Sequence, residues 1–197
     1  MSLCGLVADV ADALVELDRS RIPFKRFRAG VGPYGEPQLV RHVAEFLNAL
    51  DTYRGLTASK RTPDLLIRGR WAIEFKLARP FGDNGKEAEN WSVNLLHPYA
   101  GNVSVIGDCL KLVTWSGPER KAVVVVCYEH TPPQISVAPL LRAFEVVATQ
   151  AVGLRIGDRV VESRSGLVHP VHQQLIVVSW EVLGAVEQGD EADKRAG

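Results

Sequence analysis

The order of hydrophobic and polar residues divides the chain into helical and extended segments. Apolar residues recur every three or four positions over 3–17, 37–50, 102–115 and 139–151, which predicts four amphipathic helices. Runs rich in β-branched residues over 121–128, 160–168 and 174–182 predict strands, the first of them buried on both faces. Residues 53–59 are expected to form an earlier strand or the lead-in to it. Helices and strands are interspersed along the chain, which indicates an α/β protein.

Residues 63–76, PDLLIRGRWAIEFK, contain two apolar runs around a polar turn, a pattern that predicts a β-hairpin. A three-residue loop centred on Gly69 pairs residue i with residue 138 − i, so that Asp64 lies opposite Glu74. Lys76, two positions on, then points to the same face as Glu74, while Phe75 points to the other. A shift of one residue in register would separate the two acids.

Two carboxylates and an ammonium at the open end of a hairpin suit metal-ion catalysis. Adjacent carboxylates repel each other and favour a bound cation, and oxygen ligands suit Mg²⁺ or Mn²⁺. Such an ion acidifies a bound water and offsets charge on a phosphoryl oxygen. Lys76 can position or deprotonate that water, or stabilise the developing charge. The alternative is an ordinary surface hairpin with a salt bridge.

Pro63-Asp64, nine further residues and then Glu74-Phe75-Lys76 resemble the signature of the PD-(D/E)XK nuclease superfamily. The resemblance implies a restriction-endonuclease-like fold, a central mixed β-sheet flanked by helices with an αβββαβ core, here with an extra C-terminal helix and strands. It also implies a metal-dependent phosphodiesterase acting on DNA. Asp64 and Glu74 would be metal ligands, the Phe75 backbone carbonyl a third ligand, and Lys76 the catalytic lysine.

A glycine-rich turn over 29–35 precedes the second helix, which Glu36 heads. The run from Gly32 to Val40 resembles the first-helix segment of archaeal-type Holliday-junction resolvases, and this resemblance implies that Glu36 is a third catalytic acid, touching the metal directly or through water. Pro37 departs from that subgroup, which usually has a basic residue at this position. Glu36 can also be read as a favourable charge at a helix N-terminus.

Basic residues near these segments are candidates for contacting DNA phosphates, namely Arg26, Arg28, Lys60, Arg61 and Lys86. The first two lie in a basic segment, 19–28, that is equally well read as a solvated connector. Lys86 lies in a long loop over 78–99, a candidate flap over the substrate. Trp91 of that loop would stack on a base, or would simply anchor the loop to the core.

Two further pairs of polar residues receive simpler interpretations. Asp108 and Lys111 stand three apart on the helix over 102–115, which is most simply a surface ion pair, although a helix after the lysine strand lines the cleft in the family. His169 and His172 lack a third metal ligand nearby in the sequence and are interpreted as part of a turn.

Composition narrows the possible partners. The chain has 23 basic and 23 acidic residues and no formal net charge, so any DNA contact must come from local patches. The three cysteines form no Cys-x-x-Cys pair, which argues against a zinc ribbon or a disulfide framework and fits a reduced cytoplasm. The acidic first segment does not resemble a signal peptide, and no apolar run approaches the length of a membrane span.

We therefore expect one nuclease-like domain over 1–183, in which 1–28 form a helix and a basic connector, followed by a polar tail over 184–197. The expected activity is hydrolysis of DNA phosphodiester bonds with Mg²⁺ or Mn²⁺, in restriction, repair or recombination. A homodimer would suit cleavage of both strands of a duplex. The alternative is a noncatalytic module that binds DNA or a protein, which the complete set of two acids and a lysine argues against.

Overall fold

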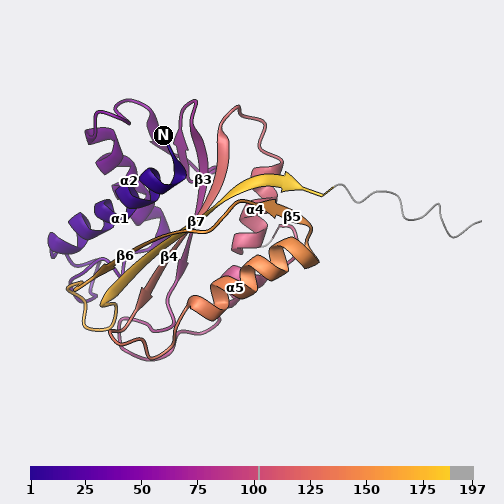
Figure 1. Cartoon of the computed structure of the whole chain (residues 1–197). Coiled ribbons are helices and arrows are strands. Elements are labelled where there is room, and N and C mark those ends of the chain that lie inside the picture. Colours follow the sequence, from indigo (N-terminus) through magenta and orange to yellow (C-terminus); the bar gives the residue numbers. More distant parts are fainter. Residues whose placement is uncertain (102, 187–197) are drawn as a thin grey trace, which may run out of the picture.

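A mixed seven-stranded sheet runs through the centre of the computed structural model, which describes residues 1–101 and 103–186 (Figure 1). Its strands lie in the order β1, β2, β3, β4, β7 and β5, and β6 also pairs with β7. Their bounds are β1 Thr57–Ser59, β2 Leu65–Ile67, β3 Trp71–Ala78, β4 Arg120–Glu129, β5 Leu154–Ile156, β6 Val160–Ser165 and β7 Gln174–Ala185. The predicted α/β class with a mixed sheet is confirmed.

Helices cover both faces of the sheet (Figure 1). One face packs against α1 (Leu3–Arg19) and α2 (Glu36–Ala49), and the other against α3 (Val93–Leu96), α4 (Val105–Val113) and α5 (Ala138–Val146), which continues as a π-helical turn over Val147–Ala151. Because side chains alternate along a strand, Val124 and Val126 of β4 enter the first layer while Val123 and Val125 enter the second. The run of valines in β4 is therefore buried on both faces, as predicted.

The hairpin adopts the predicted register. Leu65 pairs with Ile73, Leu66 with Ala72 and Ile67 with Trp71, around a turn in which Gly69 has a φ of 65°. Asp64, one residue before β2, therefore lies opposite Glu74. Beyond the hairpin, β4 pairs in parallel with β3 after a crossover that contains α3 and α4.

Several predicted boundaries were wrong. The loop over 78–99 contains α3, whereas the segment over 53–59 is a lead-in of turns followed by β1 at Thr57–Ser59, which is within the prediction. The third predicted helix begins later, at Val105, where the Ser104 hydroxyl accepts a hydrogen bond from the Gly107 amide; residue 102 lies outside the described residues. β7 continues to Ala185, two residues into the expected tail, and the tail from 187 lies outside the described residues.

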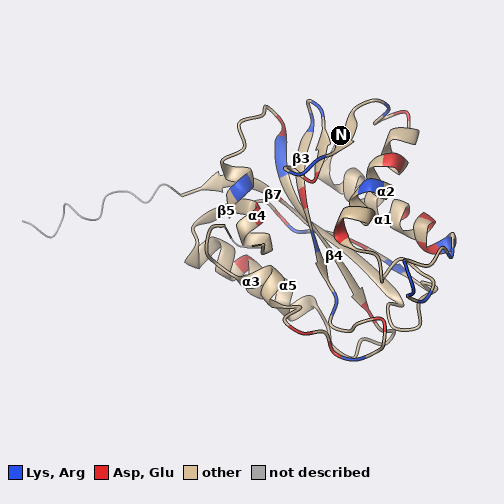
Figure 2. Ribbon diagram, turned by 180° about the vertical axis from the view of Figure 1, so that it is seen from behind, with Lys and Arg blue, Asp and Glu red and all other residues tan. Residues whose placement is uncertain are grey.

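Charged residues of both signs are distributed over the fold (Figure 2). Cys109 and Cys127 are buried free thiols, and Cys4 is an exposed one. Within the described part of the chain, no helix combines the length and the apolar character that crossing a membrane requires.

Candidate active site

The two hairpin acids meet at the point where β2 begins. The Phe75 amide donates a hydrogen bond of 2.8 Å to Oδ2 of Asp64, which fixes that carboxylate beside β3. Glu74 lies opposite Asp64, close enough for the Asp64 carboxylate to act on the ionisation of Glu74. The predicted convergence of an acid from each arm of the hairpin is present in the structure.

Glu74 is the more buried of the two acids, with 4% of its surface exposed. Burial, the charge of Asp64, the hydrogen bond with Asp64 and the charge of Asp108 together raise the pKa of Glu74 to about 8. Within the described residues, Oε1 of Glu74 has no hydrogen-bond partner. The pair therefore holds a proton at neutral pH unless a cation takes its place.

The residues present fit a hard divalent cation. Among residues 1–101 and 103–186, no three His, Cys, Asp or Glu side chains are grouped as a metal site, so a cation at the hairpin would have Asp64 and Glu74 as its carboxylate donors and would otherwise rely on backbone oxygen and water. Mg²⁺ needs only one or two carboxylates because it keeps several waters. The amide and carbonyl of one strand residue point to the same side, so the Phe75 carbonyl lies on the Asp64 side of β3.

Lys76 lies between two further acids. Its Nζ is 3.7 Å from Oε1 of Glu36 and 3.0 Å from Oδ2 of Asp108, while Oδ1 of Asp108 accepts a hydrogen bond of 2.6 Å from Lys111. Asp108 and Lys111 do form the predicted ion pair, but the prediction of a surface pair was wrong, because Asp108 is only 1% exposed. A signal existed in the sequence: Asp108 falls on the apolar stripe of its helix, three residues after Val105 and four before Leu112.

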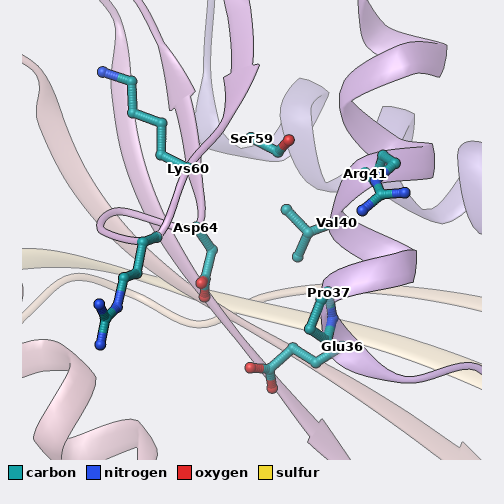
Figure 3. A pocket seen from close by; sticks show the side chains of 8 residues that line it. Glu36, Pro37, Val40, Arg41, Ser59, Lys60 and Asp64 are labelled. Atoms are coloured by element: carbon teal, nitrogen blue, oxygen red, sulfur yellow. The ribbon is translucent and has the colours of Figure 1, made fainter.

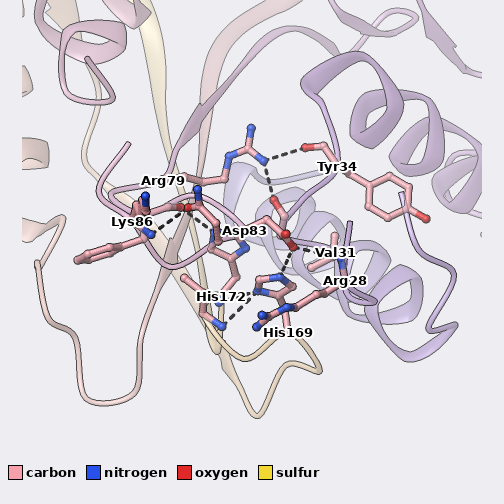
Figure 4. Close-up of polar contacts among 12 residues, drawn as sticks. Arg28, Val31, Tyr34, Arg79, Asp83, Lys86, His169 and His172 are labelled. Carbon is pink, nitrogen blue, oxygen red and sulfur yellow. Dashed lines mark hydrogen bonds and ion pairs between the residues drawn. The ribbon is translucent and has the colours of Figure 1, made fainter. Parts of the chain in front are cut away.

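Glu36 is placed by a loop that several side chains hold. Arg79, directly after β3, donates hydrogen bonds to the carbonyls of Gly32 (2.7 Å) and Tyr34 (3.3 Å) (Figure 4). A Cβ on Gly32 would lie 2.2 Å from Nδ1 of His172, so only glycine fits there. The helix that Glu36 heads therefore starts at a fixed position. Burial raises the pKa of Glu36, and the charge of Lys76 opposes that rise.

His169 and His172 form a buried stacked pair, with ring centroids 4.5 Å apart. Nε2 of His169 lies 2.7 Å from Oδ1 of Asp83, and Nε2 of His172 lies 2.9 Å from the Phe81 carbonyl (Figure 4). Burial lowers the pKa of His172 to about 4. The interpretation as a simple turn missed this role, in which the pair joins the loop after β3 to the glycine-rich loop.

The predicted DNA-binding residues lie in three different places. Lys60 and Arg61 line a cleft of about 420 Å³ together with Glu36, Asp64 and Arg41, although the Lys60 side chain extends away from the two carboxylates (Figure 3). Arg28 and Lys86 lie near Asp83 and His169 instead (Figure 4), and the Arg28 amide donates to Asp83. Arg26 is exposed in the connector. Trp91 is half-buried against the layer of α3–α5, in keeping with an anchoring role.

Comparison of the chain with protein-family models, with curated proteins and with solved structures finds no match in any of the three.

Proposed function

We propose that this protein is a divalent-metal-dependent DNA nuclease with a restriction-endonuclease-like core. The order of elements supports the proposal: α2 is followed by β1, β2 and β3 as antiparallel neighbours, then by the short helix α3, by α4 and by a parallel β4. This order is in keeping with the αβββαβ core that the sequence resemblance implies, with α3 as an addition. The remaining elements, α5 and β5–β7, extend the sheet beyond β4.

The observation that carries the proposal is the pairing of the buried acid Glu74 with Asp64, which lines the cleft. Burying a carboxylate oxygen without a hydrogen-bond partner costs free energy of folding. Here the oxygen is Oε1 of Glu74, and the neighbouring side chain, Asp64, is also an acid. Neither acid lies within ion-pair distance of a Lys or Arg among the described residues, since Lys76 and Lys111 pair with Asp108. Such an arrangement favours a divalent cation over an internal salt bridge.

Each group then has a role in phosphodiester hydrolysis. Asp64, Glu74 and the Phe75 carbonyl would hold Mg²⁺ or Mn²⁺, which when bound supplies an acidified water and offsets phosphoryl charge. The water oxygen would bond to phosphorus as the ester P–O bond breaks, and the proton that the water loses would pass through solvent to the departing oxygen. Lys76 orients that water and stabilises the added negative charge, and Glu36 holds the Lys76 ammonium from the side of the cleft. Arg61 and Arg41, which line the cleft, contact neighbouring phosphates.

The test is cleavage of duplex, single-stranded and branched DNA with Mg²⁺, Mn²⁺ or a chelator. We expect metal-dependent cleavage that falls by at least about a hundredfold in Asp64→Asn, Glu74→Gln and Lys76→Met, since each removes a group that acts on the reacting atoms. Glu45→Gln is the matched control, because Glu45 is an exposed acid on α2. Binding of DNA without cleavage under every condition would instead support a noncatalytic module.

A further inference from the structure

The buried carboxylate of Asp108 forms ion pairs with two lysines that come from different elements. Its Oδ1 is 2.6 Å from Lys111 on its own helix, and its Oδ2 is 3.0 Å from Lys76 on β3. The carboxylate is almost fully buried, whereas 42% of the Lys111 side chain is exposed. An unpaired buried carboxylate would be strongly destabilising, so Asp108 has to hold its cations.

Both lysines are also near the proposed metal ligands. Lys76 projects from the same face of β3 as Glu74, two residues away. Lys111 is close enough for the charges of Glu74 and Asp64 to act on it. Burial alone would lower the pKa of Lys111, but the hydrogen bond with Asp108 and the charges of the three acids raise that pKa. Either ammonium could therefore turn to Asp64 or Glu74 if Asp108 did not hold it.

We propose that Asp108 is a positioning residue that retains both lysines and thereby leaves the Asp64–Glu74 pair free for a divalent cation. This inference rests on the proposed metal site and adds a residue that the Asp64, Glu74 and Lys76 motif does not contain. The role is one of competition: an ammonium beside Asp64 or Glu74 would occupy oxygens that the cation needs. Asp108 prevents that without contacting the cation itself.

The proposal makes a prediction about metal affinity that needs no DNA. In Asp108→Asn the amide keeps the shape of the side chain but loses the charge, so Lys76 and Lys111 are released to the acid pair. We expect the Mn²⁺ dissociation constant, measured by isothermal titration calorimetry, to rise at least about tenfold (about 1.4 kcal/mol). In the triple variant Asp108→Asn/Lys76→Met/Lys111→Met the competitors are absent, and the affinity should return to within about threefold of the wild type.

The recovery separates positioning from a general structural effect. If Asp108 only stabilised the fold, two more substitutions around it would not restore Mn²⁺ binding, and a loss that persists in the triple variant overturns the proposal. So does an affinity in Asp108→Asn within about threefold of the wild type. Asp51→Asn is the matched control, because Asp51 also pairs with a cation three residues on, Arg54, but both are exposed; an equal loss there would also count against the proposal.

The same titration distinguishes this inference from the proposed function. A wild-type protein that binds no Mn²⁺ would overturn both. A wild type that binds Mn²⁺ and depends on Glu74, combined with an unaffected Asp108→Asn, would overturn only the role of Asp108. Thermal unfolding of each variant shows whether the loss of affinity follows from loss of the folded state, and the triple variant keeps the proposal falsifiable if the single variant unfolds.

Discussion

Metal binding at Asp64 and Glu74 should depend steeply on pH, because a cation has to displace the proton that the pair holds. The pKa of Glu74 is raised to about 8, so the cation competes with one proton at every pH below that value. The observed dissociation constant is then the intrinsic one multiplied by 1 + 10^(8 − pH). Relative to high pH, Mn²⁺ binding should be weaker by about tenfold at pH 7 and by about a hundredfold at pH 6.

The assay is calorimetric titration of Mn²⁺ between pH 6 and pH 9. Titrations in two buffers with different ionisation enthalpies at pH 7 should show the release of about one proton for each ion bound. Glu74→Gln, which has no proton to release, should bind the ion weakly and without this pH dependence. An affinity that is constant from pH 6 to pH 8, or binding without proton release, would refute the reasoning.

The stability of the metal-free protein should show the same ionisation with a definite sign. The folded pKa of Glu74 lies above its ordinary value of 4.5, so the folded state binds the proton more tightly than the unfolded state. This contribution is complete below pH 4.5 and is lost as the pH rises through about 8, at up to about 1.4 kcal/mol per pH unit. Glu74→Gln should therefore be less sensitive to pH over this range, and saturating Mn²⁺ should offset the loss in the wild type.

Three further predictions follow from the packing and the cleft. Gly32→Ala should destabilise the fold by about 1–3 kcal/mol and impair the placement of Glu36, because the added Cβ would lie 2.2 Å from Nδ1 of His172. In thermal unfolding the control is Gly5→Ala, whose added Cβ would lie 3.4 Å from its nearest neighbour. Equal losses of stability in the two variants would contradict the clash at Gly32. Phe144→Ala should lower the free energy of unfolding in urea by about 3–5 kcal/mol, since Phe144 is fully buried against Trp180; a cost under about 1 kcal/mol would show that the packing there is loose. Arg61→Met should weaken DNA binding and reduce the slope of log K against log salt by about one. Lys86→Met should change the affinity and the slope less, because Lys86 lies outside the cleft. A larger effect of Lys86→Met than of Arg61→Met would place the DNA over the loop at His169.

Local sequence signals were sufficient for the hairpin and for the acids that it carries. The turn at Gly69 and the alternation on either side set the register, and the register alone brings Asp64 opposite Glu74. The first two helices also followed from periodicity, because each is long enough for its apolar pattern to repeat, and the buried strand β4 followed from its unbroken run of valines. The three-residue strand β5 was not predicted, because unlike the equally short β2 it does not stand beside a longer strand across a tight turn.

Contacts between distant elements could not be predicted in this way. Asp108 is bound to Lys76 from a different element, and His169 is bound to Asp83, 86 residues earlier. Such pairs depend on how helices and loops pack on the sheet, which periodicity does not report. The position of Asp108 on an apolar stripe was the one local sign that its carboxylate is buried, and a buried acid implies a partner.

Because β2 is short, the edge of β3 that faces it has no strand partner from Glu74 onward. The Phe75 amide therefore donates its hydrogen bond to the Asp64 side chain instead of to a backbone carbonyl. That single proton is a natural spectroscopic reporter on the Asp64 carboxylate. The chemical shift of this amide proton and its rate of exchange with solvent should change when Asp64 binds a ligand. The chemical shifts and exchange rates of the β3 amides that point to β4 should not change.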